Sequence, residues 1–256
     1  RHNYIYSVSL DDYKRKKAAF LYDGTNSGFN YFIVHRGYIY YVKNGGTDLK
    51  EQTAYLYRVK IGDTSQKREE EPIYEFSGIG ASVWNVTASG NNIIVNNSAY
   101  GDTEGNDYKN SYTIIDIHSL KSKELVENGN YSVFADGNYV YYGKNENTVY
   151  RIDLATNEET FFCDIDGPCY ISADSNYVYF DNLQSIYAGT DADNRKIFVY
   201  DKSGKYITYI VPQSPKDECY FGGDDYMFFK DMGSNSKVYS FDKSLLTSTD
   251  RQFIDM

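Results

Sequence analysis

A pair of strand-like motifs recurs along the whole chain, and it constrains the fold more than any other feature. The first motif is a turn residue followed by a tyrosine-rich apolar run, as in residues 138–142 (Asn-Tyr-Val-Tyr-Tyr). The second motif follows after a polar loop, as in residues 149–153 (Val-Tyr-Arg-Ile-Asp). Short aromatic and β-branched runs between turn residues are typical of strands. Because no longer stretch carries an apolar stripe of helical period, we predict an all-β chain.

The second motif returns about every 47 residues, which is the period of a β-propeller built from four-stranded blades. In the fourth repeat we expect an inner strand at 131–135 and further strands at 139–142, 149–154 and 159–163. We predict one propeller domain over residues 1–256, with a partial blade at 4–22 and full blades at about 30–76, 83–128, 131–163, 169–211 and 219–255. Six blades would then require that the first inner strand pair lies upstream of Arg1.

Composition narrows the possible partners. The chain carries a formal net charge of −10, which argues against nucleic acid or an anionic membrane surface as the main partner. Its apolar runs are short, so we expect no transmembrane segment. We further expect a monomer without a cofactor. With 29 tyrosines among 256 residues, the composition again favours strands and leans towards a secreted or surface protein.

The repeats resemble the six-bladed propellers of the low-density-lipoprotein-receptor type, whose second strands carry a Tyr-Trp-Thr-Asp motif. They look closest to bacterial relatives of unassigned function. Residues 179–181 (Tyr-Phe-Asp) and 141–142 (Tyr-Tyr) stand where that motif would be, with Tyr or Phe in place of Trp. The resemblance implies six blades and a non-catalytic role. In the receptor proteins such propellers bind other proteins.

Propellers place ligands at the end built from the loops between second and third strands and from the crossovers between blades. Two of these loops, residues 96–110 and 181–194, are long and carry tyrosines and aspartates. Trp84, the single tryptophan, is expected at the start of an inner strand, where its ring would stack on a sugar or anchor a partner. We therefore select seven candidate binding residues: Trp84, Tyr100, Asp102, Tyr108, Tyr187, Asp191 and Asp193. The alternatives are that the loops are merely solvated and that Trp84 fills the space between two blades.

Metal binding and disulfide bonding find little support. Asp102, Glu104 and Asp107 gather oxygens in one loop, but a turn rich in Asp and Asn explains them without calcium. We expect no metal site. Cys163 and Cys169 are expected on opposite sides of a blade, too far apart to pair. Cys169 and Cys219 open neighbouring inner strands but are offset by one residue in the alignment of the repeats, so we expect free buried thiols. The basic run at residues 14–17 is expected to be a solvated turn between two strands.

No catalytic signature stands out in the sequence. It has no Gly-x-Ser-x-Gly elbow, no His-Glu-x-x-His motif and no phosphate-binding glycine loop. The first hypothesis is therefore a non-catalytic binding propeller of a secreted or surface-anchored bacterial protein that recognises a protein or glycan with its loop-rich face. A carbohydrate-active enzyme or lectin with its site at the channel mouth is the alternative, because paired carboxylates leave no sequence signature. A purely structural module is the third possibility.

Overall fold

The computed structural model describes the chain in segments. The described residues are 4–8, 14–20, 29–45, 52–65, 71–101, 106–127, 133–145, 147–165, 167, 169–182, 195–214, 217–220, 225–230, 237–247 and 253–255. The contacts among residues divide the chain into two compact units, Arg1–Asn128 and Gly129–Met256, and each is described by itself.

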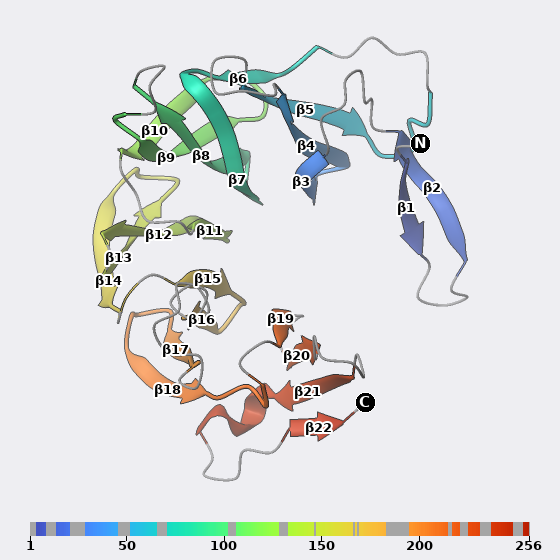
Figure 1. Cartoon of the computed structure of the whole chain (residues 1–256). Coiled ribbons are helices and arrows are strands. Elements are labelled where there is room, and N and C mark those ends of the chain that lie inside the picture. The colour runs from blue at the N-terminus through green and yellow to red at the C-terminus, as the bar shows by residue number, and fades with distance from the viewer. Residues whose placement is uncertain are drawn as a thin grey trace. The chain divides into compact units, whose positions relative to one another are not determined.

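The first unit contains a two-stranded sheet and two four-stranded antiparallel sheets, in which the strands lie side by side in chain order (Figure 1). The two-stranded sheet pairs β1 (Tyr4–Val8) with β2 (Arg15–Phe20). The next sheet contains β3 (Phe29–His35), β4 (Tyr38–Gly45), β5 (Thr53–Lys60) and β6 (Tyr74–Phe76). The third contains β7 (Ile79–Ser89), β8 (Asn92–Tyr100), β9 (Lys109–Asp116) and β10 (Ser122–Glu127).

The second unit contains three four-stranded sheets of the same design. The first is built from β11 (Val133–Asp136), β12 (Tyr139–Asn145), β13 (Thr148–Asp153) and β14 (Glu159–Asp164). The second is built from β15 (Tyr170–Ala173), β16 (Tyr177–Asp181), β17 (Ile197–Asp201) and β18 (Tyr206–Ile210). The third is built from β19 (Glu218–Tyr220), β20 (Tyr226–Lys230), β21 (Val238–Asp242) and β22 (Phe253–Asp255), with a short 3₁₀ helix, η1 (Lys243–Thr247), after β21.

The tyrosine-rich motif forms the second strand of these sheets. Its first tyrosine is half-buried, whereas the tyrosine two residues later on the same face is fully buried, as for Tyr139 and Tyr141. Their ring centroids lie 6.4 Å apart, and the equivalent pairs that start at Tyr38 and Tyr177 lie 6.3 Å apart. Large aromatic rings therefore fill the same position in successive sheets, which explains the tyrosine content.

The aspartate at the end of most third strands closes a turn. In Asp116, Asp153, Asp201 and Asp242, Oδ1 accepts a hydrogen bond of 2.7–3.1 Å from the backbone N–H two residues later. This is an Asx turn, a local arrangement that aspartate favours. Hydrogen bonds from a serine in the turn are the main cause that lowers the pKa of Asp116, Asp201 and Asp242. The recurring aspartate of the sequence motif is thus a structural residue.

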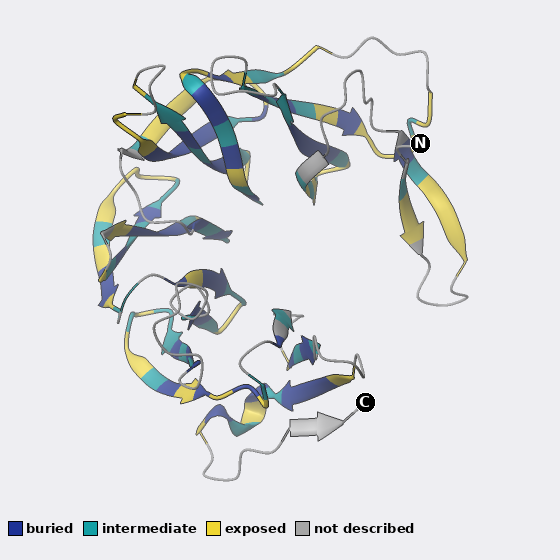
Figure 2. Ribbon diagram, viewed as in Figure 1, coloured by how far each residue is buried: buried dark blue, intermediate teal, exposed yellow. Residues whose placement is uncertain are grey.

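Apolar side chains from successive sheets pack together within each unit. In the first unit, Leu56 of β5, Ile93 of β8 and Ile115 of β9 belong to one buried cluster. In the second unit, Val149 and Phe180 belong to a cluster shared by the first two sheets. Buried and exposed residues alternate along many strands (Figure 2), as expected for sheets that pack on one another and also meet solvent. Each four-stranded sheet therefore has the design of a propeller blade.

The structure departs from the sequence predictions in two places. Residues 15–17 of the basic run lie within strand β2 and are exposed, so the predicted turn is wrong there. Side chains on a strand that face water can be charged, which explains how this run is accommodated. Trp84 lies in the middle of β7 rather than at the start of an inner strand, because β7 already begins at Ile79.

Candidate functional site

A cleft of about 460 Å³ opens in the first unit, between the outer part of the β3–β6 sheet and one face of the β7–β10 sheet. Its lining is mainly polar. The residues that line it are Tyr74, Phe76, Ser77, Gly78, Asn97, Ala99, Tyr100, Gly101, Lys109, Ser111, Thr113, Ser122 and Glu124. The volume falls within the range of small-ligand sites. The cleft lies at the end of β8 and the start of β9, which are separated by residues 101–108. The loop predicted at 96–110 is therefore wrong at both ends, because residues 96–100 belong to β8 and residues 109–110 to β9.

Hydrogen-bonded side chains from three neighbouring strands form the floor of this cleft. Thr113 Oγ1 donates to Asn97 Oδ1 at 2.9 Å, which joins β9 to β8. Ser111 Oγ donates to Glu124 Oε1 at 2.6 Å, which joins β9 to β10. Hydroxyl and amide groups can donate hydrogen bonds to a polar ligand and accept them from it, whereas a carboxylate can only accept them. Among the described residues that line the cleft, Glu124 is the one carboxylate.

Backbone hydrogen bonds join the described residues on either side of residues 102–105. The Gly101 N–H donates to the carbonyl oxygens of Asn106 at 3.1 Å and of Asp107 at 3.2 Å. The rings of Tyr100 and Tyr108, which flank this turn, have centroids 5.1 Å apart at an angle of 55°. The structure therefore brings two of the predicted binding residues into contact, and it places Tyr100 at the edge of the cleft.

Gly78 allows the other wall of the cleft to approach β8 closely. Its φ is +117°, a value that residues with a side chain rarely adopt. A Cβ at this position would lie 2.5 Å from the Cβ of Ala99. Both the backbone conformation and the contact thus require glycine, and the shape of the cleft depends on it.

Trp84 does not line this cleft. It lies at a bulge, where the register of β7 against β8 shifts between Val83 and Asn85. Its indole N–H donates to Ser98 Oγ at 2.7 Å, and its side chain is 46% exposed. Successive side chains of a strand point to opposite faces, so Ser98 faces away from the cleft that Asn97 lines. The exposure also disagrees with the alternative that Trp84 fills the space between two sheets.

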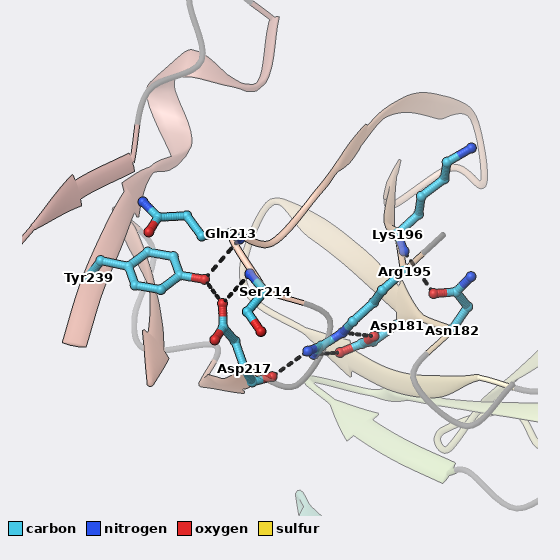
Figure 3. A network of polar contacts seen from close by, with 8 residues as sticks. All are labelled: Asp181, Asn182, Arg195, Lys196, Gln213, Ser214, Asp217 and Tyr239. Carbon is cyan, nitrogen blue, oxygen red and sulfur yellow. Dashed lines mark hydrogen bonds and ion pairs between the residues drawn. The ribbon is translucent and has the colours of Figure 1, made fainter. Parts of the chain in front are cut away.

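In the second unit, a buried ion pair joins described residues on either side of residues 183–194. Asp181 ends β16 and Arg195 precedes β17, so the two residues flank residues 183–194. The guanidinium donates to both carboxylate oxygens, from Nε at 3.0 Å and from Nη2 at 2.6 Å (Figure 3). Both side chains are almost inaccessible, with exposures of 1% for Arg195 and 5% for Asp181. Loops that carry function are commonly held in this way by a rigid scaffold.

The same network continues into the next sheet. Arg195 Nη1 donates to the backbone carbonyl of Asp217, which precedes β19 (Figure 3). Asp217 Oδ2 accepts from Tyr239 and from the Ser214 backbone N–H, the latter at 2.8 Å. Burial is the main cause that raises the pKa of Tyr239, and its hydrogen bond to Asp217 adds to the effect. The Asp181 of the receptor-like motif is therefore part of a structural link between successive sheets.

Four of the seven predicted binding residues lie outside the described residues: Asp102, Tyr187, Asp191 and Asp193. The cleft side chains Asn97, Ser111, Thr113 and Glu124 were not predicted from the sequence. The sequence carries no signal for them, because they come from three strands and meet only through the register of the sheet. A second cavity, of about 440 Å³, lies in the second unit and has aromatic walls that include Tyr200 and Tyr206.

The described residues contain no group of three or more His, Cys, Asp or Glu side chains placed to hold a metal ion. In the same part of the chain, no helix has the length and apolar character needed to span a membrane. The three cysteines are free thiols. Burial raises the pKa of Cys163 to about 12, and burial likewise raises the pKa values of Cys169 and Cys219.

The chain is similar to solved structures in fold, at low sequence identity. It matches the C-terminal WD40 domain of Sif2 with a TM-score of 0.57 and 11% identity, over 98% of this chain and 66% of that one. It matches an oligogalacturonate lyase in complex with manganese with a TM-score of 0.60 and 11% identity, over 96% and 69% of the two chains. WD40 domains are β-propellers, so the all-β propeller fold predicted from the repeats is confirmed.

Dipeptidyl peptidase 4 of Porphyromonas gingivalis also matches, with a TM-score of 0.57 and 11% identity, over 98% of this chain and 42% of that one. The computationally designed Ika8 protein matches with a TM-score of 0.51 and 12% identity, over 90% and 62%. The chain thus spans less than two thirds of these two proteins. Neither a family model nor a curated protein matches the chain by sequence. The number of blades and the likeness to the receptor-type propellers stay predictions.

Proposed function

We propose that the chain is a non-catalytic binding propeller of a secreted or surface-anchored bacterial protein, and that the cleft of the first unit receives a glycan. The polar cleft at the end of β8 and the start of β9 is the observation that carries this proposal. Fold alone does not define a function, so the argument rests on the chemistry of the lining.

The lining suits a sugar because side chains that donate hydrogen bonds and side chains that accept them lie next to one another on the face of the sheet. Ser111, Thr113 and Asn97 come from adjacent strands and present hydroxyl and amide groups a few ångströms apart. A sugar presents hydroxyl groups at similar spacing, each able to donate and accept. The ring of Tyr108, which is 39% exposed and contacts the lining residue Tyr100, offers an apolar surface for stacking on the sugar ring.

The test is a thermal-shift panel on the purified chain with host and bacterial oligosaccharides, followed by titration calorimetry for each hit. A ligand at about 100 times its dissociation constant stabilises the folded state by about 2.7 kcal/mol, which gives a measurable shift. Thr113→Val removes one hydroxyl group at nearly constant volume, and Tyr108→Ala removes the ring at the rim. Each variant should weaken binding by about tenfold, as expected for one lost hydrogen bond or stacked ring.

Tyr206→Ser is the matched control, because this exposed tyrosine lines the separate cavity of the second unit. It should leave glycan affinity unchanged. Binding that survives Thr113→Val and Tyr108→Ala but is lost in Tyr206→Ser would move the site to the second unit and contradict the proposal for the cleft. A partner captured only as a protein, with no response to any sugar, would replace glycan recognition by protein recognition. Fractionation of the source cells would test the proposed extracellular location.

A further inference from the structure

A second cavity of the first unit, of about 260 Å³, lies at the opposite end of the same two sheets from the glycan cleft. It is formed by the turn between β3 and β4, by the start of β4, by the end of β5, and by the residues after β9. The lining residues are Arg36, Tyr38, Tyr40, Arg58, Ile117 and His118. Two of the six are arginines, and none is acidic.

The corresponding place in the second unit is filled by a carboxylate from the chain itself. Asp174, which follows β15, accepts a 2.5 Å hydrogen bond from the Tyr179 hydroxyl and forms a 2.5 Å ion pair with Lys243 of the next sheet. One sheet earlier, Asp136 at the end of β11 forms a 2.5 Å ion pair with Lys202. In both sheets the repeat thus pairs a carboxylate at the end of the first strand with a lysine of the next sheet. In the Asp174 sheet this carboxylate also accepts from the buried tyrosine of the second strand, whereas the equivalent Tyr141 hydroxyl has no hydrogen-bond partner among the described residues.

In the first unit this internal carboxylate is missing from the repeat. The position of Asp136 and Asp174 is taken by His35, whose Nε2 lies 2.9 Å from the carbonyl oxygen of Gly90. Tyr40 occupies the position of Tyr179, because it follows His35 by five residues as Tyr179 follows Asp174. The Tyr40 side chain is fully buried, and its hydroxyl has no hydrogen-bond partner among the described residues.

Positive charge remains in the cavity although the carboxylate is absent. Arg58 donates from Nη1 to the Ile117 carbonyl at 3.0 Å, and its guanidinium carbon lies 5.3 Å from the centroid of the Tyr38 ring. Burial raises the pKa of Tyr40, and the positive charge of the nearby Arg58 guanidinium opposes this effect. The guanidinium and the Tyr40 hydroxyl do not form a hydrogen bond of normal geometry. Among the described residues, the carboxylate closest in sequence to a lining residue is that of Asp116, which precedes Ile117. Its Oδ1 accepts hydrogen bonds from backbone N–H groups of its own turn.

The turn that carries Arg36 is conformationally costly. Arg36 has a φ of +47°, in the left-handed region that disfavours residues with a side chain. The equivalent turns of two other sheets have glycine there, Gly90 and Gly137, with φ values of +57° and +56°. An arginine in this position costs stability and yet places a guanidinium at the cavity, as is common at ligand sites.

We propose that this cavity binds the carboxylate group of a small organic acid, which takes the place that Asp174 fills in the second unit. The Tyr40 hydroxyl would donate to one oxygen of the ligand, and the guanidinium groups of Arg58 and Arg36 would supply charge-assisted hydrogen bonds. The cavity is slightly smaller than drug-sized ligand sites, so it suits one small anionic group. This site shares no lining residue with the glycan cleft, and either can exist without the other.

The experiment is an NMR titration of the arginine Nε–Hε signals with sodium acetate, at constant ionic strength maintained with sodium chloride. The Arg58 signal, identified from its loss in Arg58→Gln, should shift with a saturable dependence on acetate. Tyr40→Phe keeps the ring but removes the donor, and it should weaken binding by about tenfold or more, the loss expected for a hydrogen bond to a charged group. Arg36→Gly should also weaken binding, while its melting temperature stays unchanged or rises because the strain is relieved.

Two variants decide the interpretation. His35→Asp supplies the carboxylate that the other repeats carry, and it should abolish acetate binding in a folded protein. Arg151→Gln alters the equivalent arginine of the second unit, beside the internal carboxylate Asp136, and should leave acetate binding unchanged. The proposal is overturned if acetate causes no more change than chloride, or if His35→Asp binds acetate as the parent does. Equal or tighter binding of sulfate would overturn the assignment to a carboxylate.

Discussion

The buried ion pair between Asp181 and Arg195 leads to a quantitative prediction for Arg195→Met. Methionine keeps most of the apolar stem and removes the guanidinium, so the Asp181 carboxylate stays buried without its charged partner. The substitution also removes the donor to the Asp217 carbonyl. With side-chain exposures of only 1% and 5%, solvent cannot compensate for either loss. Breaking one side of such a pair costs about 3–5 kcal/mol, a large part of the total stability of about 5–15 kcal/mol.

Urea denaturation measures this loss, with two probes because the chain has two compact units. Near-ultraviolet circular dichroism follows tyrosines in both units, whereas tryptophan fluorescence follows the first unit through Trp84. A loss of about 3–5 kcal/mol lowers the melting temperature by about 6–20 °C in a chain of this length. If the units unfold separately, the fluorescence transition should stay in place while the dichroism transition shifts.

The matched control is Lys144→Met, which breaks an ion pair of similar length, 2.5 Å, with Glu159. Here the two side chains are 44% and 33% exposed, so the loss should stay below about 1 kcal/mol. A double variant, Asp181→Leu with Arg195→Met, removes both charges and should recover part of the lost stability. The reasoning is refuted if Arg195→Met costs no more than Lys144→Met, or if the double variant is less stable than the single one.

Three further predictions follow from the site and the buried groups. Burial raises the pKa of Asp174, but hydrogen bonds, chiefly from its lysine partner, outweigh this effect and hold the pKa below 3.8. The ionised carboxylate therefore stabilises the folded state fully above about pH 4, and this stabilisation is lost as the pH falls below that value. The acid unfolding of Asp174→Asn, followed by circular dichroism, should thus depend less steeply on pH. Cys163, Cys169 and Cys219 should react with a disulfide reagent at pH 8 only at the rate of unfolding, since their raised pKa values leave little thiolate; rapid labelling of native protein would contradict this. Gly78→Ala should lower the melting temperature and glycan affinity together, because its positive φ and the neighbouring strand both exclude a Cβ; an unchanged melting temperature would show that the wall can move.

The strands were predictable because they depend on local sequence. The turn residues and aromatic runs of each repeat act within a few residues of one another, so the second-strand motifs coincide with β4, β12, β16 and β20. Residues 15–17 were mispredicted because four adjacent basic residues suggest a turn, whereas an edge strand exposed to water tolerates them. The length of β7 was underestimated, since its first residues lack the tyrosine-rich pattern.

The cleft was only partly predictable. The long 96–110 loop pointed to Tyr100 and Tyr108 because loop length is visible in the sequence. The floor was not visible, because Asn97, Thr113 and Glu124 come from three strands and meet only through the register of β8 with β9 and of β9 with β10. Such a register depends on the whole sheet and cannot be read from one strand.

The carboxylate cavity became visible only when the repeats were compared in three dimensions, and the same comparison yields one more prediction. If the repeat builds a carboxylate site and fills it with Asp174, deleting that side chain should create a site for an external acid. Asp174→Ala leaves the Tyr179 hydroxyl and the Lys243 ammonium, which is 3% exposed, without their carboxylate. The variant should lose about 3–5 kcal/mol, as for other broken buried pairs, and acetate should restore part of its melting temperature. Sodium chloride at the same ionic strength should not restore the melting temperature. If both salts restore the melting temperature equally, the pocket responds to ionic strength alone. The proposal that this position of the repeat binds a carboxylate would then be wrong for both units.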